Sequence, residues 1–180
     1  MRSGAKVGDL IFVTGALGGA AAGLKLLENG ERYGPSDLNN LLLRQLAPNP
    51  QIEVGKLIGE NKLATAMIDL SDGLVGDLFH ICQQSHIGAK LFADKIPDQF
   101  DLEKYHPFFS LSEMINFLLY SGEDFELLFT VNPKKIFQLE KKLKNYQIFA
   151  IGEVTANTEI IELSANEKLQ ILEPKGFRHF

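Results

Sequence analysis

The chain has little of what cross-links secreted domains or builds thiolate metal sites, because Cys82 is the only cysteine in 180 residues. A single cysteine forms neither an internal disulfide framework nor a Cys-based metal site. Cys82 also falls on the apolar side of the helix expected after residue 73. We therefore expect a protein that folds without covalent cross-links, which fits a reducing cytoplasm.

Histidine and basic charge are also sparse. The four histidines, His80, His86, His106 and His179, show no metal-ligand spacing and accompany no convincing nucleophile. Zinc chemistry and a Ser-His-Asp triad therefore find no support. The formal charge of -5 and the pI near 5.4 leave no basic stripe for counterion release. These values argue against nucleic acid or an anionic membrane as a partner.

Long hydrophobic runs are absent as well. No apolar run is long enough to span a bilayer, and no signal peptide precedes the first expected strand. We expect a soluble, cytoplasmic protein. With 45% hydrophobic residues, the chain is able to bury one core, and we expect a single domain over residues 1–180. The first residues lead directly into a strand, as in a piece cut from a longer chain, although a short native protein also begins this way.

Hydrophobic periodicity and turn residues predict alternating strands and helices. Strands are expected at 10–14, 66–69, 89–93, 121–131 and 147–151, with a terminal hairpin of 160–163 and 169–172. Helices are expected at 20–28, from 35–37 to 46, at 52–61, after 73, and at 110–119 and 133–144, with a polar loop at 98–107.

The segment Ala66–Leu74 joins an apolar strand to an amphipathic helix through two carboxylates and a hydroxyl. Helix N-termini attract phosphate, yet Asp69 and Asp72 repel it, and a divalent cation resolves this conflict. Mg²⁺ prefers carboxylate and phosphate oxygens together. The alternative is that Ser71 and Asp72 only cap the helix while Asp69 ends a strand. Ser71 is the expected N-cap, and Asp77 falls outside the apolar stripe.

A second group of acids stands at the entrance of the expected strand 121–131. Strand alternation places Glu123 on the face of Phe125, with Asp124 and Glu126 on the other face. An acid aligned with a core face at a strand entrance is a site candidate. The alternative, that Glu123 lies in the preceding turn, is equally open.

Two further segments favour packing over chemistry. The glycine-rich turn at 15–19 lacks the Lys-Ser/Thr ending of a phosphate-binding loop, and its spacing does not match the dinucleotide fingerprint. We interpret its small residues as allowing a helix to lie close to the sheet. The aromatic tail at 176–180 resembles terminal clusters that pack on their own domain, with ligand contact the less common use.

The ordered set of these segments resembles thiamine-monophosphate kinase. The resemblance covers essentially the whole chain but only the C-terminal half of that enzyme, whose superfamily includes aminoimidazole ribonucleotide synthetase, selenophosphate synthetase and the hydrogenase-maturation dehydratase. The matching segments are RSGAKVGD at 2–9, TG at 14–15, AAGL at 21–24, IDLSDGL at 68–74, GEDFEL at 122–127 and the ending GFRHF at 176–180.

The resemblance implies an α/β (α+β) fold, a mixed sheet with packed helices like the C-terminal domain of aminoimidazole ribonucleotide synthetase. It also implies Mg²⁺-dependent, direct in-line transfer of the ATP γ-phosphate to thiamine monophosphate, giving thiamine diphosphate. In such a transfer metal ions and Arg2 contribute more than any base, and no covalent enzyme intermediate is required. The positions that match family sites are Asp69 and Asp72 for Mg²⁺, Arg2 and Ser71 for ATP, and Glu123 and Phe177 for thiamine phosphate.

Several positions depart from the family pattern. Gly19 replaces an acid, Ala47 and Gln51 replace arginines, and Arg178 replaces an acid. Phe177 replaces a Tyr or Trp, which keeps the ring and loses a donor. These changes bear on phosphate contacts and local ion pairs and leave the central carboxylates intact.

The resembled enzyme has an N-terminal domain that supplies most metal carboxylates, nucleotide contacts and the dimer barrel. From the resemblance we expect a homodimer at full length, and we expect the isolated chain to fold but to turn over poorly or not at all. Two alternatives stay open: a sister ATP-dependent enzyme of the superfamily, and a stand-alone ligand-binding or regulatory module.

Overall fold

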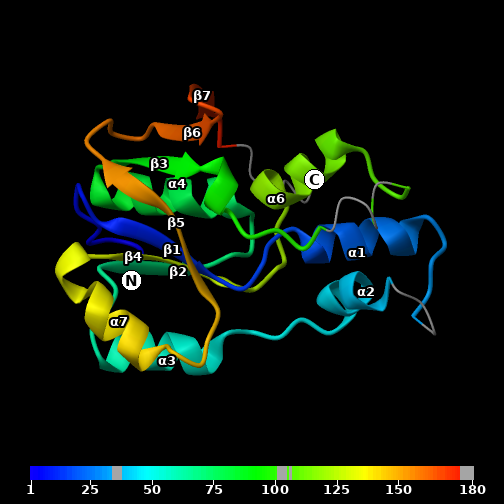
Figure 1. Cartoon of the computed structure of the whole chain (residues 1–180), viewed down its shortest axis with the longest axis horizontal. Coiled ribbons are helices and arrows are strands. Elements are labelled where there is room, and N and C mark those ends of the chain that lie inside the picture. Colours follow the sequence, from blue (N-terminus) through cyan, green and yellow to red (C-terminus); the bar gives the residue numbers. More distant parts are fainter. Residues whose placement is uncertain (34–37, 101–104, 106, 175–180) are drawn as a thin grey trace.

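A mixed sheet of seven strands forms the frame of the molecule (Figure 1). The structure is a computed structural model that describes residues 1–33, 38–100, 105 and 107–174. The strands are β1 Leu10–Thr14, β2 Ala66–Asp69, β3 Gly88–Phe92, β4 Leu127–Val131, β5 Ile148–Thr155, β6 Ile161–Ala165 and β7 Lys168–Leu172. The helices are α1 Gly19–Glu28, α2 Asn39–Leu46, α3 Ile52–Glu60, α4 Leu74–Ser85, α6 Leu111–Tyr120 and α7 Ile136–Lys142, with short 3₁₀ turns at Ala93–Lys95 and Pro133–Lys135.

The strand order is β2-β4-β1-β5-β3-β6-β7. Neighbouring strands are antiparallel except β3 and β6, which run parallel. The predicted α/β fold with a mixed sheet is therefore confirmed. β2 is an edge strand, so the loop that follows Asp69 opens at the side of the sheet.

Alternating side chains of the central strand β1 build two separate cores. Ile11 and Val13 are fully buried among residues of α4, including Leu78. Phe12 points to the opposite face, where it stacks on Phe129 with ring centroids 5.6 Å apart and packs with residues of α3 and α7. The period of two along the strand thus gives the sheet a helical layer on each face.

A third cluster joins α1, α2 and α6 at one end of the sheet (Figure 1). It contains Leu26 of α1, Leu41 of α2 and Phe117 of α6, with Phe109 set edge-on to Phe117 at 5.4 Å. This cluster is separate from the two cores of the sheet. α1 and α2 therefore form their own packed unit, and it borders the pocket described below.

The predicted strands at 10–14 and 66–69 and the terminal hairpin are confirmed. The helices are confirmed with ends within one or two residues of the prediction, except at 133–144, where a 3₁₀ turn at Pro133–Lys135 precedes α7 at Ile136–Lys142. The strand predicted at 147–151 continues to Thr155. Residues 34–37, at the start of the second predicted helix, and part of the loop at 98–107 lie outside the described residues. α6 begins with a capping box of Ser110 and Glu113.

Cys82 of α4 is buried in the hydrophobic core, as its place in the apolar stripe predicts. Burial raises the pKa of its thiol to about 12, so the group is a small apolar filler rather than a nucleophile. Within the described part of the chain, none of the helices combines the length and apolar character needed to cross a membrane.

Candidate functional site

The loop between β2 and α4 is shaped by a buried carboxylate. Asp77, in the first turn of α4, is only 1% exposed. Its Oδ2 accepts hydrogen bonds from the N–H groups of Ser71 and Asp72, both at 3.0 Å. Ser71 is therefore not the N-cap, and that prediction is wrong. Gly73 holds the N-cap position with φ 108°, and no side-chain hydrogen bond caps the helix there.

Asp77 falls outside the apolar stripe of the helix, yet its side chain is buried. The side chain turns back from the helix toward two loop N–H groups, so burial and hydrogen bonding replace solvation. Burial raises the pKa of Asp77 to about 6, against the lowering effect of the Asp72 N–H. The negative charges of Asp72 and Asp69 add to the rise in pKa. Both aspartates thus lie near enough to act on Asp77.

The carboxylates of Asp69 and Asp72 are accessible, because Asp69 is exposed and Asp72 is half-buried. Asp77 has one oxygen committed to the loop backbone. In the described ranges of the chain, no group of three or more His, Cys, Asp or Glu side chains is placed to hold a metal ion. What the loop offers is two hard oxygen donors of like charge beside a third, an arrangement that a cation stabilises.

The segment before β4 lies directly against this loop. The Glu123 N–H donates to the Ser71 carbonyl oxygen at 3.1 Å, and the Phe125 N–H donates to the Leu70 carbonyl oxygen at 3.0 Å. In return, the Leu70 N–H donates to the Glu126 carbonyl oxygen at 2.8 Å. These bonds continue the pairing of Asp69 with Leu127 past the end of the β2–β4 ladder.

Glu123 nevertheless lies outside the strand, so the prediction that it shares a strand face with Phe125 is wrong. Both residues have positive φ, 66° and 51°, and β4 begins only at Leu127. The close approach of two backbones imposes this shape. A Cβ on Gly122 would lie 1.9 Å from the Ser71 carbonyl oxygen, a distance that only glycine permits.

The second acid of this segment, Asp124, binds the N-terminus of α1. Its carboxylate accepts hydrogen bonds from Gly18 N–H at 2.7 Å and Ala20 N–H at 3.1 Å and is 5% exposed. Burial raises the pKa of Asp124, while the N–H groups of Ala20 and Gly18 work in the opposite direction. Asp124 therefore supplies the missing cap of α1, whose own N-cap residue is a glycine.

The third acid, Glu126, is 1% exposed and is held from both sides. Its Oε1 lies 2.9 Å from Arg44 Nη1, and its Oε2 accepts a hydrogen bond from the Thr14 hydroxyl at 2.6 Å. Arg44 also donates to the Ala16 carbonyl oxygen at 2.7 Å. Burial raises the pKa of Glu126, opposed by its bonds to Thr14 and Arg44. Sequence reasoning missed Arg44, although a lone cation within a run of leucines in α2 was a usable indication.

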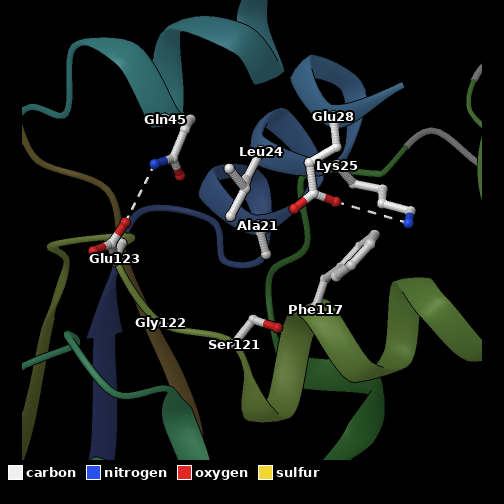
Figure 2. A pocket seen from close by; sticks show the side chains of 9 residues that line it. All are labelled: Ala21, Leu24, Lys25, Glu28, Gln45, Phe117, Ser121, Gly122 and Glu123. Atoms are coloured by element: carbon white, nitrogen blue, oxygen red, sulfur yellow. Dashed lines mark hydrogen bonds and ion pairs between the residues drawn. The ribbon is translucent and has the colours of Figure 1, made fainter. Parts of the chain in front are cut away.

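Glu123 itself is exposed and lies at the edge of a pocket of about 370 Å³ (Figure 2). Figure 2 shows the Gln45 side chain reaching from α2 toward Glu123, with Nε2 and Oε2 3.2 Å apart. Lys25 and Glu28 lie 3.8 Å apart on the far side. The lining residues are Ala21, Leu24, Lys25 and Glu28 of α1, Gln45 of α2, Phe117 of α6, and Ser121, Gly122 and Glu123.

The predicted site residues that the structure describes fall into two places. Ser71 and Glu123 are joined by the 3.1 Å backbone hydrogen bond, with Asp69 and Asp72 on the same loop. None of Asp69, Ser71 and Asp72 lines the pocket of Glu123. Arg2 is exposed at the free side of β2, where the Met67 N–H donates to the Met1 carbonyl oxygen at 2.9 Å. Phe177 lies outside the described residues.

The departure at Gly19 has a local structural consequence. A Cβ at this position would lie 3.0 Å from Arg44 Cγ and 3.0 Å from Gln99 Cγ. An acid here would stand beside Arg44. In this chain Arg44 is paired with Glu126 instead.

Comparison with known proteins identifies the family of the chain. Residues 6–163 match the family described as AIR synthase related protein, C-terminal domain. The thiamine-monophosphate kinase of Buchnera aphidicola subsp. Acyrthosiphon pisum (strain APS) is 38% identical over 189 residues, covering 100% of this chain and 55% of that protein. The thiamine-monophosphate kinase of Escherichia coli (strain K12) is 36% identical over 182 residues, covering 99% of this chain and 54% of that protein.

A solved structure described as AaThiL complexed with AMPPCP and TMP superposes with a TM-score of 0.81 at 32% identity. The match covers 99% of this chain and 53% of that one. The chain thus spans about half the length of the relatives it matches. It belongs to the family described as AIR synthase related protein, C-terminal domain, and within that family it resembles the thiamine-monophosphate kinases from end to end.

Proposed function

We propose that this chain is the C-terminal part of a thiamine-monophosphate kinase, which transfers the ATP γ-phosphate to thiamine monophosphate and forms thiamine diphosphate. The relatives that cover the whole chain carry that name, and AaThiL was solved with AMPPCP and TMP. One observation carries the proposal. The Glu123 N–H bonds to the Ser71 carbonyl oxygen, so the aspartate loop and the pocket segment are held in one backbone frame.

We assign Asp69 and Asp72 to Mg²⁺. Two accessible carboxylates fit an ion that takes its remaining ligands from phosphate oxygens and water. When bound, Mg²⁺ spreads the negative charge that develops on the transferred phosphoryl group. Asp77 holds the N–H groups of Ser71 and Asp72 and so fixes the backbone that carries both ligands.

We assign Ser71 and Arg2 to ATP. Phosphoryl transfer requires chiefly that the attacking oxygen, the phosphorus and the leaving oxygen are aligned while charge is neutralised, so these residues bind and orient. No side chain needs to form a bond to phosphorus. Arg2 is exposed and follows Met1, whose carbonyl oxygen accepts a hydrogen bond from the Met67 N–H of β2.

We assign Glu123 and Phe177 to thiamine monophosphate. The thiazolium ring of this substrate is flat and cationic, and the pocket offers the apolar surfaces of Leu24 and Phe117 beside the Glu123 carboxylate. Because Lys25 and Glu28 lie 3.8 Å apart and offset each other's charge, Glu123 leaves the lining negative. Phe177 lies outside the described residues, and we assign it from the resemblance as an aromatic ring for stacking on the substrate.

The chain covers about half the length of its relatives, and the proposed activity also requires the other half. We expect the complete protein to contain an N-terminal domain with further metal and nucleotide contacts, to form a homodimer and to work in the cytoplasm. The 180-residue chain alone is then unable to complete the reaction. Turnover by the isolated chain at the rate of a complete enzyme would contradict this part of the proposal.

The test joins this chain to the N-terminal part of the E. coli relative and follows thiamine diphosphate formed from ATP and thiamine monophosphate. We expect Mg²⁺-dependent product from the fusion and none from the chain alone. The matched variant is Glu123→Gln, which keeps size and removes charge and raises the KM for thiamine monophosphate. A fusion that hydrolyses ATP without phosphorylating thiamine monophosphate would redirect the proposal to another acceptor.

A further inference from the structure

Two consecutive residues at the end of α2 contact two acids of the segment before β4. Arg44 forms an ion pair with Glu126 at 2.9 Å, and Gln45 Nε2 donates to Glu123 Oε2 at 3.2 Å. One short helix thus fixes both ends of the segment that presents Glu123 to the pocket. The sequence motifs predict neither a role for Gln45 nor its contact with Glu123.

The two contacts have opposite electrostatic consequences. The guanidinium of Arg44 cancels the charge of Glu126, which is almost completely buried. The carboxamide of Gln45 is neutral, so its hydrogen bond orients the Glu123 carboxylate and leaves the negative charge intact. Among the described residues, no Lys, Arg or His forms an ion pair with Glu123. That charge is therefore available to a ligand.

Glu123 needs such a contact because it is exposed at the edge of the pocket. Its backbone is fixed by the bond to the Ser71 carbonyl oxygen and by a left-handed φ of 66°, but the residue is exposed. A solvated glutamate side chain samples several rotamers, and fixing one of them costs free energy when a ligand binds. Gln45 restricts these rotamers before binding. Figure 2 shows both side chains meeting at one end of the pocket.

We propose that Gln45 is a positioning residue that holds the Glu123 carboxylate, still charged, at the edge of the pocket lined by α1 and α6. The positioned charge makes this pocket select a flat cationic ring. The inference rests on the proposed function and deepens it. It assigns the discrimination between cationic and neutral rings to a pair of side chains, one of which supplies the charge while the other supplies its position.

The kinetic test uses the fusion protein with three variants. Gln45→Leu removes the donor at similar volume and raises the KM for thiamine monophosphate about 2- to 12-fold, the range expected for immobilising one side chain, with kcat unchanged. Gln45→Arg pairs with Glu123 and cancels its charge, so it raises KM further than Gln45→Leu. Gln138→Leu, an exposed glutamine of α7, leaves both constants unchanged.

A second readout is independent of activity. In the 180-residue chain, the side-chain amide resonances of Gln45, which donates to Glu123 Oε2, change in Glu123→Gln, whereas those of Gln138 do not. In the kinetic cycle, Gln45→Leu has less than about a twofold further effect on KM in the Glu123→Gln background, because no carboxylate charge remains at position 123 to be positioned.

The outcomes separate the inference from the proposed function. If Glu123→Gln leaves the KM for thiamine monophosphate unchanged, the assignment of the pocket to this substrate fails. If Glu123→Gln raises KM while Gln45→Leu does not, the assignment stands and the role of Gln45 is overturned. If Gln45→Arg and Gln45→Leu raise KM by the same factor, the role of Gln45 is also overturned, because cancelling the charge of Glu123 then has no effect of its own.

Discussion

Arg44 Nη1 lies 2.9 Å from Glu126 Oε1, and the Glu126 side chain is 2% exposed. Breaking a buried ion pair leaves one charge without compensation, which costs about 3–5 kcal/mol. We expect Arg44→Leu to lower the free energy of unfolding at pH 7 by this amount. Lys56→Ala breaks the exposed pair with Glu60 and costs less than about 1 kcal/mol. Denaturant unfolding of the two variants and the parent measures both losses.

Lowering the pH restores part of the stability lost in Arg44→Leu. The pKa of Glu126 is raised by burial, and the loss of Arg44 removes a group that opposes this rise. Protonation then removes the uncompensated charge at moderately acidic pH. Equal losses of stability at pH 5 and pH 7 would show that the pair contributes through packing rather than charge.

Asp77 makes folding stability depend on pH. Its pKa is about 6 in the folded protein against the ordinary 3.8, so the folded state binds more protons between these values than the unfolded state does. Stability therefore falls as pH rises from about 4 to about 6.5 and is lowest above that range. Asp77→Asn removes the contribution of Asp77 to this slope, leaves those of Asp124 and Glu126, and keeps a side-chain oxygen for the loop N–H groups. Thermal unfolding at several pH values compares the two chains, and parallel pH profiles would refute the assignment.

Position 122 has no room for a side chain, whereas position 59 does. A Cβ on Gly122 meets the Ser71 carbonyl oxygen at 1.9 Å, whereas a Cβ on Gly59 in α3 meets nothing within 4 Å. We expect Gly122→Ala to destabilise the fold by at least about 2 kcal/mol, since two backbones must separate. Gly59→Ala stabilises it by roughly 0.5–1 kcal/mol through helix propensity. Equal effects in denaturant unfolding would mean that the segments at 71 and 122 separate without cost.

Asp72→Asn tests the metal assignment in the fusion protein. Loss of one carboxylate ligand lowers kcat at saturating Mg²⁺ by at least about 100-fold, because the metal contributes several kcal/mol to charge stabilisation. The melting temperature changes little, since Asp72 is half-buried and its N–H still binds Asp77. Asp94→Asn, an exposed aspartate after β3, serves as the control. An unchanged rate in Asp72→Asn would remove this residue from the site.

The sequence alone determined the elements of the fold and the identity of the relatives. Strand β1 and helix α4 were predictable because their periods of 2 and 3.6 residues encode which face is buried. The segment at 69–72 stood out as a candidate site because polar residues follow an apolar strand. Such features are local, and local patterns survive without knowledge of the partner segments.

Only the tertiary structure decided what the acids at 123–126 and Asp77 do. The sequence gives Glu123, Asp124 and Glu126 the same chemistry, yet one faces a pocket, one caps α1 and one pairs with Arg44, 82 residues away. The reason is physical: the free energy of a carboxylate depends on its solvation and on its nearest donors. For Asp124 and Glu126 those donors come from α1, α2 and β1, which are brought to the acids by the fold and not by the order of the chain. For Asp77 they are two N–H groups of the neighbouring loop, toward which the side chain turns back.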